Sequence, residues 1–406
     1  MVNNPNIRFA GFADDWVQCE FSNLAKVRRG LTYKPSDVRD YGIRVLRSSN
    51  IAEDTFLIKS DDVFVNKEAV KIDKVKNGDI LITSANGSSR LVGKHALIKG
   101  VNDDTVHGGF MLVARAKNPE FVNATMSSSW YSKFINNFVS GGNGAIGNLS
   151  KSNLEDQKVY VPSEKEQQKI GSVFSTLDHK IGLEERQISL LKDLKKGYLQ
   201  KMFPKNGAKV PELRFAGFAD DWEERKLGEL LTAIKRPIKM QDDDTYQLVT
   251  VKRRNEGIVS RGLFKGSQIL VKNYFELHAG DYLISKRQVV HGANGIVPKD
   301  MEGAIVSNEY LVSVGNKNIT TDFLTIISKL PIMYKMFFLS SYGIDIEKLV
   351  FNVNDWKKRE ISIPSLQEQN RISSFFKQLD NALTLHQRKL DLLKDLKKGL
   401  SQQMFV

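Results

Sequence analysis

Two groups of side chains in this sequence have the chemistry to hydrogen-bond nucleic acid. Arginine, asparagine and glutamine can each make two hydrogen bonds to one base edge, whereas lysine and backbone N–H groups suit phosphates. The first group comprises Arg44, Arg47, Ser48, Asn50, Ser84, Asn86, Arg90 and Lys94. The second group comprises Lys252, Arg253, Arg254, Lys286, Arg287, Gln288 and His291. Any one of these is ordinarily a solvated surface residue, but their grouping beside strand-like runs makes them the candidate nucleic-acid-binding residues.

Motifs for catalysis and cofactor binding are incomplete. Gly142-x-Gly144-x-x-Gly147 matches a dinucleotide-binding pattern, but it follows a helix-like segment instead of a strand. The six histidines lack the i, i+4 spacing of a metal-binding pair, and the single cysteine, Cys19, excludes a multi-cysteine zinc site. Asp242-Asp243-Asp244 reads as a solvated acidic turn. We therefore expect no catalytic, cofactor-binding or metal-binding residue on this chain.

Composition favours a soluble protein that binds a polyanion. The 406 residues include 60 Lys and Arg against 47 Asp and Glu, a net charge of +13 that steers a folded chain toward phosphates. The 41% of hydrophobic residues suffice for the packed cores of two or three domains. The sequence has neither an apolar run of ~18–20 residues nor a signal-peptide pattern at its start. We expect a cytoplasmic protein without a membrane partner.

The chain repeats one plan twice. Residues 8–16 and 214–222 both read RFAGFADDW, and residues 190–197 and 392–399 both read LLKDLKKG. The charge follows the repeat, with +6 on residues 1–203 and +7 on residues 204–406. A repeat of this kind indicates two equivalent binding units.

Each copy ends in a predicted long helix. Residues 164–203 and 366–405 are identical at 20 of 40 positions, and apolar residues recur at spacings of three and four. This seam continues for ~10 turns with a period near 3.5, so we expect the two helices to pair as an antiparallel coiled coil. Ser163-x-x-Glu166 and Ser365-x-x-Glu368 predict capping boxes at their starts. The predicted helix-pairing residues are Ile170, Phe174, Leu177, Ile181, Ile188, Leu191, Ile372, Phe376, Leu379, Leu383, Leu390 and Leu393, and the seam extends through Leu194, Tyr198, Met202, Leu396, Leu400 and Met404.

One position of the seam is polar in both copies. Glu184 and His386 are 202 residues apart, and each lies near the midpoint of its helix. In an antiparallel pair the midpoints meet, so our hypothesis is that these two side chains face each other and help to fix the register. The alternative, that both point to solvent, stays open on the sequence alone.

The parts between the repeated blocks predict mixed α/β (α+β) domains. Copy one has strand-like runs at 43–48, 79–83 and 110–114, followed by a predicted helix at 124–138. Copy two has corresponding runs at 246–251, 282–285 and 310–314, and a predicted helix at 322–339 that Pro331 kinks or splits. We therefore divide the chain into domain one (1–162), a helix (163–203), a linker (204–213), domain two (214–364) and a second helix (365–406).

This arrangement resembles the specificity subunit of type I restriction-modification systems over nearly the whole chain. The resemblance rests on Arg-Phe-x-x-Phe-x-x-x-Trp at 8–16 and 214–222, and on the Gly-Asp runs at 78–82 and 280–287. It also rests on the junctions at 148–154, 161–170 and 363–372, and on Leu-Lys-Lys-Gly at 194–197 and 396–399. The loop at 291–298 is similar to one class of target recognition domain, whereas copy one has Asn86-Gly-Ser-Ser-Arg90 in the comparable place. The two domains are therefore expected to read different sequences.

The resemblance implies two pseudo-symmetric target recognition domains separated by the two antiparallel helices. Each domain would read one half of a bipartite, asymmetric site in double-stranded DNA. The helices would set the spacer between the halves and dock two methyltransferase subunits, through which endonuclease/translocase subunits join.

By the same resemblance the chain itself is not an enzyme. S-adenosylmethionine, ATP and Mg²⁺ would bind the partner subunits, whose complex would methylate adenine at N6 and cleave DNA with ATP. The alternatives are a stand-alone, repeat-built DNA enzyme such as a nuclease, and a coiled-coil scaffold that binds only proteins.

Overall fold

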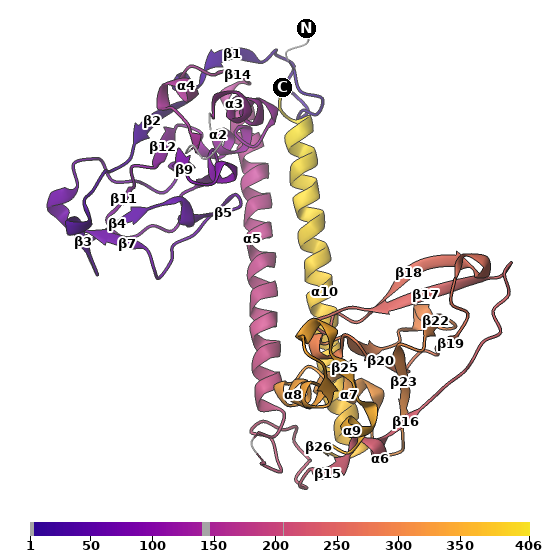
Figure 1. Cartoon of the computed structure of the whole chain (residues 1–406). Helices are drawn as coiled ribbons and strands as arrows, with labels where there is room; N and C mark the ends of the chain where they lie inside the picture. Colours follow the sequence, from indigo (N-terminus) through magenta and orange to yellow (C-terminus); the bar gives the residue numbers. More distant parts are fainter. Residues whose placement is uncertain (1–3, 140–146, 206) are drawn as a thin grey trace. The chain divides into compact units, whose positions relative to one another are not determined.

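The computed structural model describes residues 4–139, 147–205 and 207–406 (Figure 1). Gly142 and Gly144 of the glycine pattern lie outside these residues. The chain divides into two compact units, residues 1–188 with 386–406 (unit one) and residues 189–385 (unit two). Each unit therefore holds one variable domain together with a part of each long helix.

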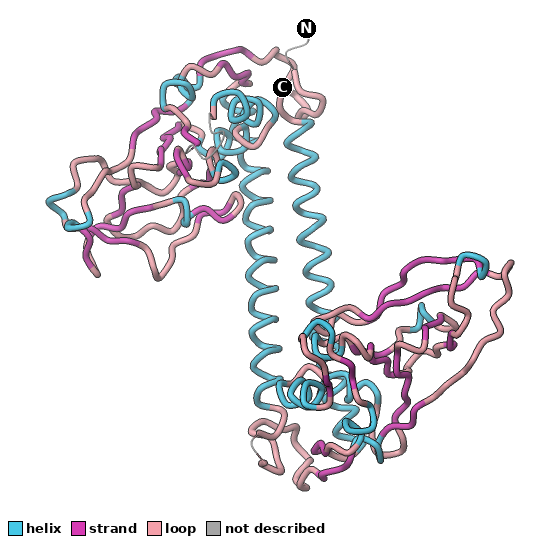
Figure 2. The backbone as a smooth tube through the Cα atoms, viewed as in Figure 1, coloured by secondary structure: helices cyan, strands magenta, loops and turns pink. Residues whose placement is uncertain are grey.

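The strands, drawn in magenta in Figure 2, include a central antiparallel sheet of unit one in the order β10-β8-β12-β2. Its strands are β2 (Ala25–Arg29), β8 (Ile80–Thr83), β10 (His95–Leu97) and β12 (Met111–Ala116). Strand β8 is buried along its whole length because both faces of the sheet are covered. Ile80 and Ile82 pack in the core with Phe121, whereas Leu81 packs in a second core with Leu46.

A second sheet of unit one has the order β11-β4-β7-β3, in which β11 and β4 run parallel. Its strands are β3 (Val38–Arg39), β4 (Ile43–Leu46), β7 (Val63–Val65) and β11 (Thr105–His107). The described residues of unit one also form three two-stranded pairs: β1 (Val17–Glu20) with β14 (Lys158–Val161), β5 (Ile51–Ala52) with β6 (Thr55–Phe56), and β9 (Ala85–Asn86) with β13 (Gly147–Asn148).

The helix predicted at 124–138 is two helices. They are α2 (Pro119–Thr125), which has a proline in its first turn, and α3 (Ser129–Phe138). Proline suits the first turn of a helix because its missing N–H would have no intrahelical partner there. The short helices α1 (Phe21–Leu24) and α4 (Lys151–Glu155) pack beside β2.

Unit two repeats the central sheet in the order β16-β23-β20-β21. Its strands are β16 (Leu231–Ala233), β20 (Tyr282–Ser285), β21 (Asn294–Ile296) and β23 (Tyr310–Gly315). As predicted, Pro331 splits the following helix into α7 (Thr321–Ile327) and α8 (Pro331–Leu339). The two-stranded pairs are β15 (Glu223–Lys226) with β26 (Glu360–Ile363) and β24 (Ser341–Tyr342) with β25 (Val350–Phe351). The short helices α6 (Leu227–Leu230) and α9 (Val353–Lys357) pack together.

The second sheet is where the two copies differ. In unit two its order is β18-β17-β22-β19, and a long antiparallel hairpin, β17 (Thr245–Val251) with β18 (Ile258–Lys265), carries an irregularity at Leu248/Val249. The other strands are β19 (Tyr274–Glu276) and β22 (Ile305–Ser307). The central sheet thus has a corresponding strand order in both units, whereas the second sheet has a different strand order in each.

The long helices are α5 (Glu164–Lys201) and α10 (Leu366–Gln403). Within unit one, Asp178 of α5 contacts Lys397 of α10, and Glu184 of α5 contacts His386 of α10. Residue numbers therefore rise along α5 while those of their partners fall along α10. Within unit two, Lys195 contacts Asp380 and Tyr198 packs on Phe375, in the same sense. The helix segments in each unit are therefore antiparallel.

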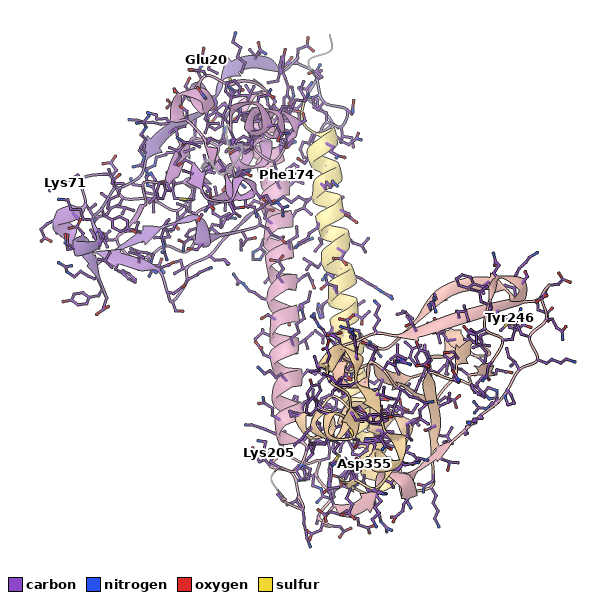
Figure 3. The ribbon with its side chains drawn as sticks, in the orientation of Figure 1. Glu20, Lys71, Phe174, Lys205, Tyr246 and Asp355 are labelled. Atoms are coloured by element: carbon purple, nitrogen blue, oxygen red, sulfur yellow. The ribbon has the colours of Figure 1, made fainter. Side chains whose placement is uncertain are left out.

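Most of the predicted seam is buried or half-buried, including Phe174, which Figure 3 marks on α5. The prediction was wrong for Leu194 and Leu396, which are 46% and 50% exposed on the outer face of their helices. The polar slot has the hypothesised geometry, because Glu184 Oε2 lies 2.6 Å from His386 Nδ1 and Lys389 reaches the other carboxylate oxygen.

The end of each helix enters the core of the domain from the other copy. Phe405 lies two residues beyond α10, and its ring centroid is 6.3 Å from that of Trp16 and 5.5 Å from that of Phe174. Phe203, two residues beyond α5, has its ring centroid 5.9 Å from that of Trp222 and 6.3 Å from that of Phe376. The tryptophan that ends each repeated opener is therefore a core residue.

The predicted capping boxes are replaced by ion pairs. Arg8 donates two hydrogen bonds, of 2.8 and 2.9 Å, to the Glu166 carboxylate, and Arg214 donates two, of 2.7 and 2.8 Å, to the Glu368 carboxylate. Ser365 Oγ still accepts a hydrogen bond from the Glu368 N–H, at 3.3 Å. The glutamate carboxylates instead bind the arginine of the repeated opener, because this charge-assisted pairing satisfies both carboxylate oxygens.

Candidate nucleic-acid interface

In unit one, four residues meet at a small pocket of about 230 Å³. Arg47 and Ser48 follow the end of β4, Asn86 ends β9, and Phe110 precedes β12. Asn86 Nδ2 donates a hydrogen bond to Ser48 Oγ at 3.0 Å. Arg47 Nε is buried and has no hydrogen-bond partner among the described residues. As candidates for contact with nucleic acid, Arg47, Ser48, Asn86 and Phe110 are called the reading pocket of domain one.

Glycines allow the backbone to form this pocket. A Cβ atom on Gly30 would lie 1.9 Å from the carbonyl oxygen of Gly108, so only glycine fits where these two segments cross. Directly afterwards Phe110 projects outward and is 70% exposed, which is unusual for so large an apolar side chain. Sequence reasoning placed Phe110 at the start of a strand and missed it as a site residue. The signal was the Gly108-Gly109 pair before it.

Three residues predicted to bind nucleic acid are engaged inside the fold, which corrects their assignment. Arg44 lies between Asp62 and Asp103, both at 2.8 Å, and its hydrogen bond to Asp103 raises its pKa. The side chain of Asn50 is fully buried, and that of Ser84 is nearly so. Arg44 is half-buried in β4 with both of its carboxylate partners, and Asn50 and Ser84 are buried, so none of the three presents a free side chain at the surface. Arg90 is exposed on a short 3-10 turn and Lys94 is half-buried, and neither lines the reading pocket.

In unit two the predicted residues Arg253 and His291 contact one glutamate, Glu347, and Gln288 contacts Arg253. Arg253 donates to Gln288 Oε1 through Nε and to Glu347 Oε2 through Nη2, both at 2.7 Å. His291 Nε2 lies 3.5 Å from the other oxygen of Glu347. Sequence reasoning missed Glu347, because an isolated acidic residue nearly 100 positions away carries no local signal. We call these four residues the polar cluster of domain two.

The loop that presents Arg253 has a strained backbone. Arg254 and Asn255 both have positive φ, 60° and 56°, a conformation that non-glycine residues adopt rarely. Their N–H groups donate to the carbonyls of His291 and Gly292 at 2.7 and 2.9 Å, which hold the two loops together. Strain of this kind concentrates at functional sites, where the surrounding structure over-determines the backbone.

The remaining basic residues of domain two lie around this cluster. Lys286 donates to the Asn308 carbonyl at 2.6 Å, and its burial lowers its pKa. Arg287 pairs with Glu309 at 2.7 Å, and Lys252 and Arg254 are exposed. Every predicted residue of domain two thus lies at or near the surface.

Two kinds of feature are missing from the described part of the chain. No group of three or more His, Cys, Asp or Glu side chains there is arranged to hold a metal ion. Among the same residues, no helix has the length and apolar character to cross a membrane.

Comparison with known proteins identifies relatives of both copies. The family model of the type I restriction modification DNA specificity domain matches residues 13–193 and again residues 219–395. The StySPI specificity subunit of Salmonella potsdam is 22% identical, over 91% of this chain and 86% of its own length. The EcoKI specificity subunit of Escherichia coli K12 is 28% identical over 40% of this chain and 36% of its own. The crystal structure of the type I restriction-modification S subunit from M. genitalium superimposes with a TM-score of 0.62 at 13% identity, covering 99% of each chain.

Proposed function

Since the chain belongs to the family of type I restriction modification DNA specificity domains, we propose that each of its two domains reads one half of a bipartite DNA site. The observation that carries this proposal is the match of the family model once to each copy of the repeat. The net charge of +13 supplies the general attraction to the phosphate backbone. Sequence selection then depends on the side chains that each domain presents to base edges.

The two domains present different chemistry, so we propose that the site is asymmetric. In the reading pocket of domain one, Asn86 can pair with the hydrogen-bonding edge of adenine and Phe110 can contact a thymine methyl group. In domain two, Arg253 and Gln288 suit guanine and adenine respectively. Glu347 holds Arg253 in place in the structure, which limits the side-chain entropy lost when Arg253 meets a base.

Exposed leucines on the helices support docking of two identical partners. Leu190 and Leu194 of α5 are 63% and 46% exposed, and their counterparts 202 residues later, Leu392 and Leu396 of α10, are 70% and 50% exposed. Residues four apart are neighbours on a helix surface, and contiguous exposed apolar side chains are typical of protein–protein contacts. We propose that each pair docks one methyltransferase subunit, and that endonuclease/translocase subunits join through these.

In this proposal the chemistry belongs to the partners. The methyltransferase subunits would bind S-adenosylmethionine and methylate an adenine at N6 in each half-site, and ATP and Mg²⁺ would serve the endonuclease/translocase subunits. The chain itself would position these subunits on the chosen sequence in the cytoplasm.

The test is to map N6-methyladenine across the genome of cells that carry the methyltransferase subunit, with and without this chain. We expect methylation at one bipartite motif only when the chain is present. An unchanged methylation map would contradict the proposal. Metal-dependent cleavage by the purified chain alone would favour a nuclease, and failure to bind any duplex at low salt with its partner present would favour a protein scaffold. The comparisons favour neither alternative.

A further inference from the structure

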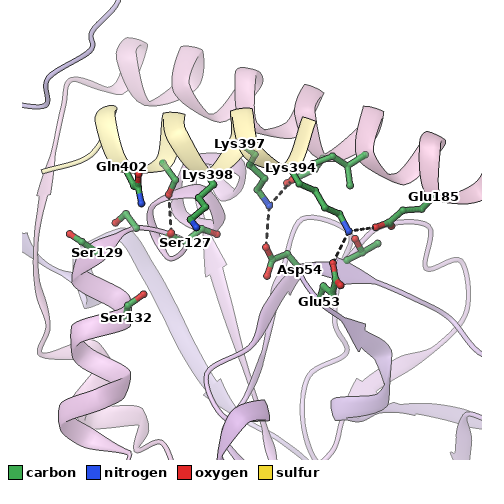
Figure 4. A pocket seen from close by; sticks show the side chains of 15 residues that line it. Glu53, Asp54, Ser127, Ser129, Ser132, Glu185, Lys394, Lys397, Lys398 and Gln402 are labelled. Atoms are coloured by element: carbon green, nitrogen blue, oxygen red, sulfur yellow. Dashed lines mark hydrogen bonds and ion pairs between the residues drawn. The ribbon is translucent and has the colours of Figure 1, made fainter. Parts of the chain in front are cut away.

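A two-residue acidic turn of domain one lies against the helices of unit one (Figure 4). Glu53 and Asp54, the acidic turn, join β5 to β6. Lys394 of α10 lies 3.0 Å from Glu53 and 2.9 Å from Glu185 of α5. Lys397 lies 3.3 Å from Asp54 and 2.8 Å from Asp178 of α5. Each lysine is therefore held between one carboxylate of the domain and one carboxylate of the partner helix.

Lys397 is the more buried of the two lysines, and its charge is stabilised by its carboxylate partners. The Lys397 side chain is only 13% exposed, beside a pocket of about 480 Å³ that the acidic turn also lines. Burial acts to lower the pKa of Lys397, yet the charges of Asp178 and Asp54 outweigh it and raise the pKa. A buried ammonium group is stable only when paired, so Asp54 contributes to holding the domain on the helix. The contact through Glu53 is more exposed and therefore weaker.

The backbone of the turn is unfavourable for a residue of the type found there. Glu53 has a φ of 53°, in the left-handed region that favours glycine and asparagine. Two-residue hairpin turns strongly prefer Asn-Gly or Asp-Gly for this reason. Glu-Asp is a poor sequence for such a turn, and the structure keeps it where both carboxylates meet lysines.

The acidic turn is connected to the reading pocket through a short, hydrogen-bonded path. The hairpin pairs Ile51 with Phe56, and the preceding residue is the buried Asn50. The side chain of Asn50 accepts a hydrogen bond from the Arg47 N–H at 2.7 Å and donates to the Leu57 carbonyl at 2.9 Å. Arg47 in turn lines the reading pocket. The path from the helix contact to the base-reading side chains is thus a few bonded residues long.

Domain two offers an internal comparison. Lys195 is the counterpart of Lys397 at an offset of 202 residues, and it pairs with Asp380, the counterpart of Asp178. Among the described residues no acidic side chain of domain two joins that pair, and the basic Lys329 approaches Asp380 at 4.0 Å instead. The ion pairs between the helices are common to both units, whereas the acidic turn belongs to domain one.

We propose that Glu53 and Asp54 are positioning residues that fix the reading pocket of domain one on α10. This inference rests on the function proposed above. By holding the hairpin on the helix, the acidic turn sets the position from which Arg47, Ser48, Asn86 and Phe110 meet the bases. Its loss should relax selectivity in one half-site and leave the other intact.

The test uses the complex with methyltransferase subunits and the double variant Glu53→Gln/Asp54→Asn. Methylation rates are measured on a matched duplex and on duplexes with one mismatch in either half-site. The half-site of domain one is the one whose selectivity changes in Arg47→Ala. We expect the variant to lose about tenfold in mismatch discrimination there, the scale of one base-edge contact, and none in the other half-site. Asp54→Glu, which keeps the charge, should restore most of the discrimination lost in Asp54→Asn.

A matched control separates position from overall charge. Asp40→Asn/Glu68→Gln removes two exposed carboxylates of the same domain, so it changes the net charge equally and should keep wild-type discrimination. Lys397→Gln probes the same contact from the helix side, and thermal unfolding shows whether each variant is folded. Unchanged discrimination in both folded variants, or an equal loss in both half-sites, would overturn the inference. If the wild-type complex methylates no bipartite site, the proposed function itself fails, and this inference falls with it.

Discussion

Arg8 and Arg214 each join the start of their own copy to the first turn of its long helix. Their partners, Glu166 and Glu368, are almost completely buried, so each carboxylate depends on its arginine for compensation. Both arginines have a raised pKa, mainly because of the hydrogen bond to the glutamate. The repeated opener and the repeated helix start are thus two halves of one ion pair.

Arg8→Ala should leave the Glu166 charge buried without a partner and lower the free energy of unfolding of unit one by about 3 kcal/mol. Arg214→Ala should do the same in unit two. Chemical denaturation measures both effects. The control is Lys117→Ala, because Lys117 pairs with Glu164 at the same helix start but is exposed, and its loss should cost less than about 1 kcal/mol. Equal effects of Arg8→Ala and Lys117→Ala would contradict the argument.

Phe110 is exposed in the reading pocket, so its role should appear in recognition and not in stability. Phe110→Ala should leave the unfolding midpoint nearly unchanged and reduce discrimination between matched and mismatched bases in one half-site by about 1–3 kcal/mol. Binding to duplexes with single mismatches, at fixed salt, measures this loss. Phe138→Ala, which removes another partly exposed phenylalanine of domain one, should leave discrimination as in the wild type.

At the scale of elements, local patterns predicted the shared frame and missed the divergent sheet. Strands β8 and β20 were predictable because a Gly-Asp turn precedes a short apolar run in both copies. The parallel pairing of β4 with β11 was not, because it joins Arg44 to Thr105 and leaves no local signal. The same separation hid Asp62 and Asp103, the carboxylates that hold Arg44 inside the fold.

In the candidate site, too, groupings that follow from local sequence could be predicted, and those that follow from long-range contacts could not. The grouping of Arg47 with Asn86, and of Arg253 with Gln288, could be anticipated because polar residues directly follow strands. Phe110 was missed although the Gly108-Gly109 pair precedes it, because the close approach of Gly30 to Gly108 joins segments far apart in the sequence. Which of the predicted residues remain exposed depends on tertiary packing, and the local sequence does not show that packing.

The polar slot of the helix pair predicts a pH dependence. The hydrogen bonds from His386 and Lys389 lower the pKa of Glu184. A carboxyl group whose pKa is lower in the folded protein stabilises it fully above its ordinary pKa, and this contribution is lost as the pH falls through the folded value. Glu184→Gln should therefore reduce the loss of stability on acidification below pH ~4.5. Denaturation curves across this range measure it, with Asp193→Asn, an exposed carboxylate of α5, as the control. Identical pH profiles in both variants would exclude a role for the slot.

At the scale of the whole molecule, neither unit consists of one copy alone. Unit one takes its last core residues, Met404 and Phe405, from the second helix, and unit two takes Met202 and Phe203 from the first. Phe405→Ala should therefore destabilise the domain that lies farthest from it in sequence. Each long helix therefore contributes residues to both units.

The length of these helices should determine the spacer between the two half-sites. Inserting one helical turn into both α5 and α10 adds ~5 Å, which corresponds to about 1.5 base pairs. The methylation motif of the lengthened protein, determined across the genome, should have a longer non-specific spacer and unchanged half-sites. The same spacer in both proteins would refute this dependence.

The exchange of helix ends also determines what half of this protein can do. A fragment of residues 1–203 lacks the Phe405 that completes its core, but it carries the equivalent Phe203 on a free helix end. Two such fragments can complete each other, so the fragment should form a homodimer, and light scattering would show twice its mass. Phe203→Ala should remove this association. A homodimer presents the same reading pocket twice. The protein encoded by half of this gene would then recognise a palindromic DNA site.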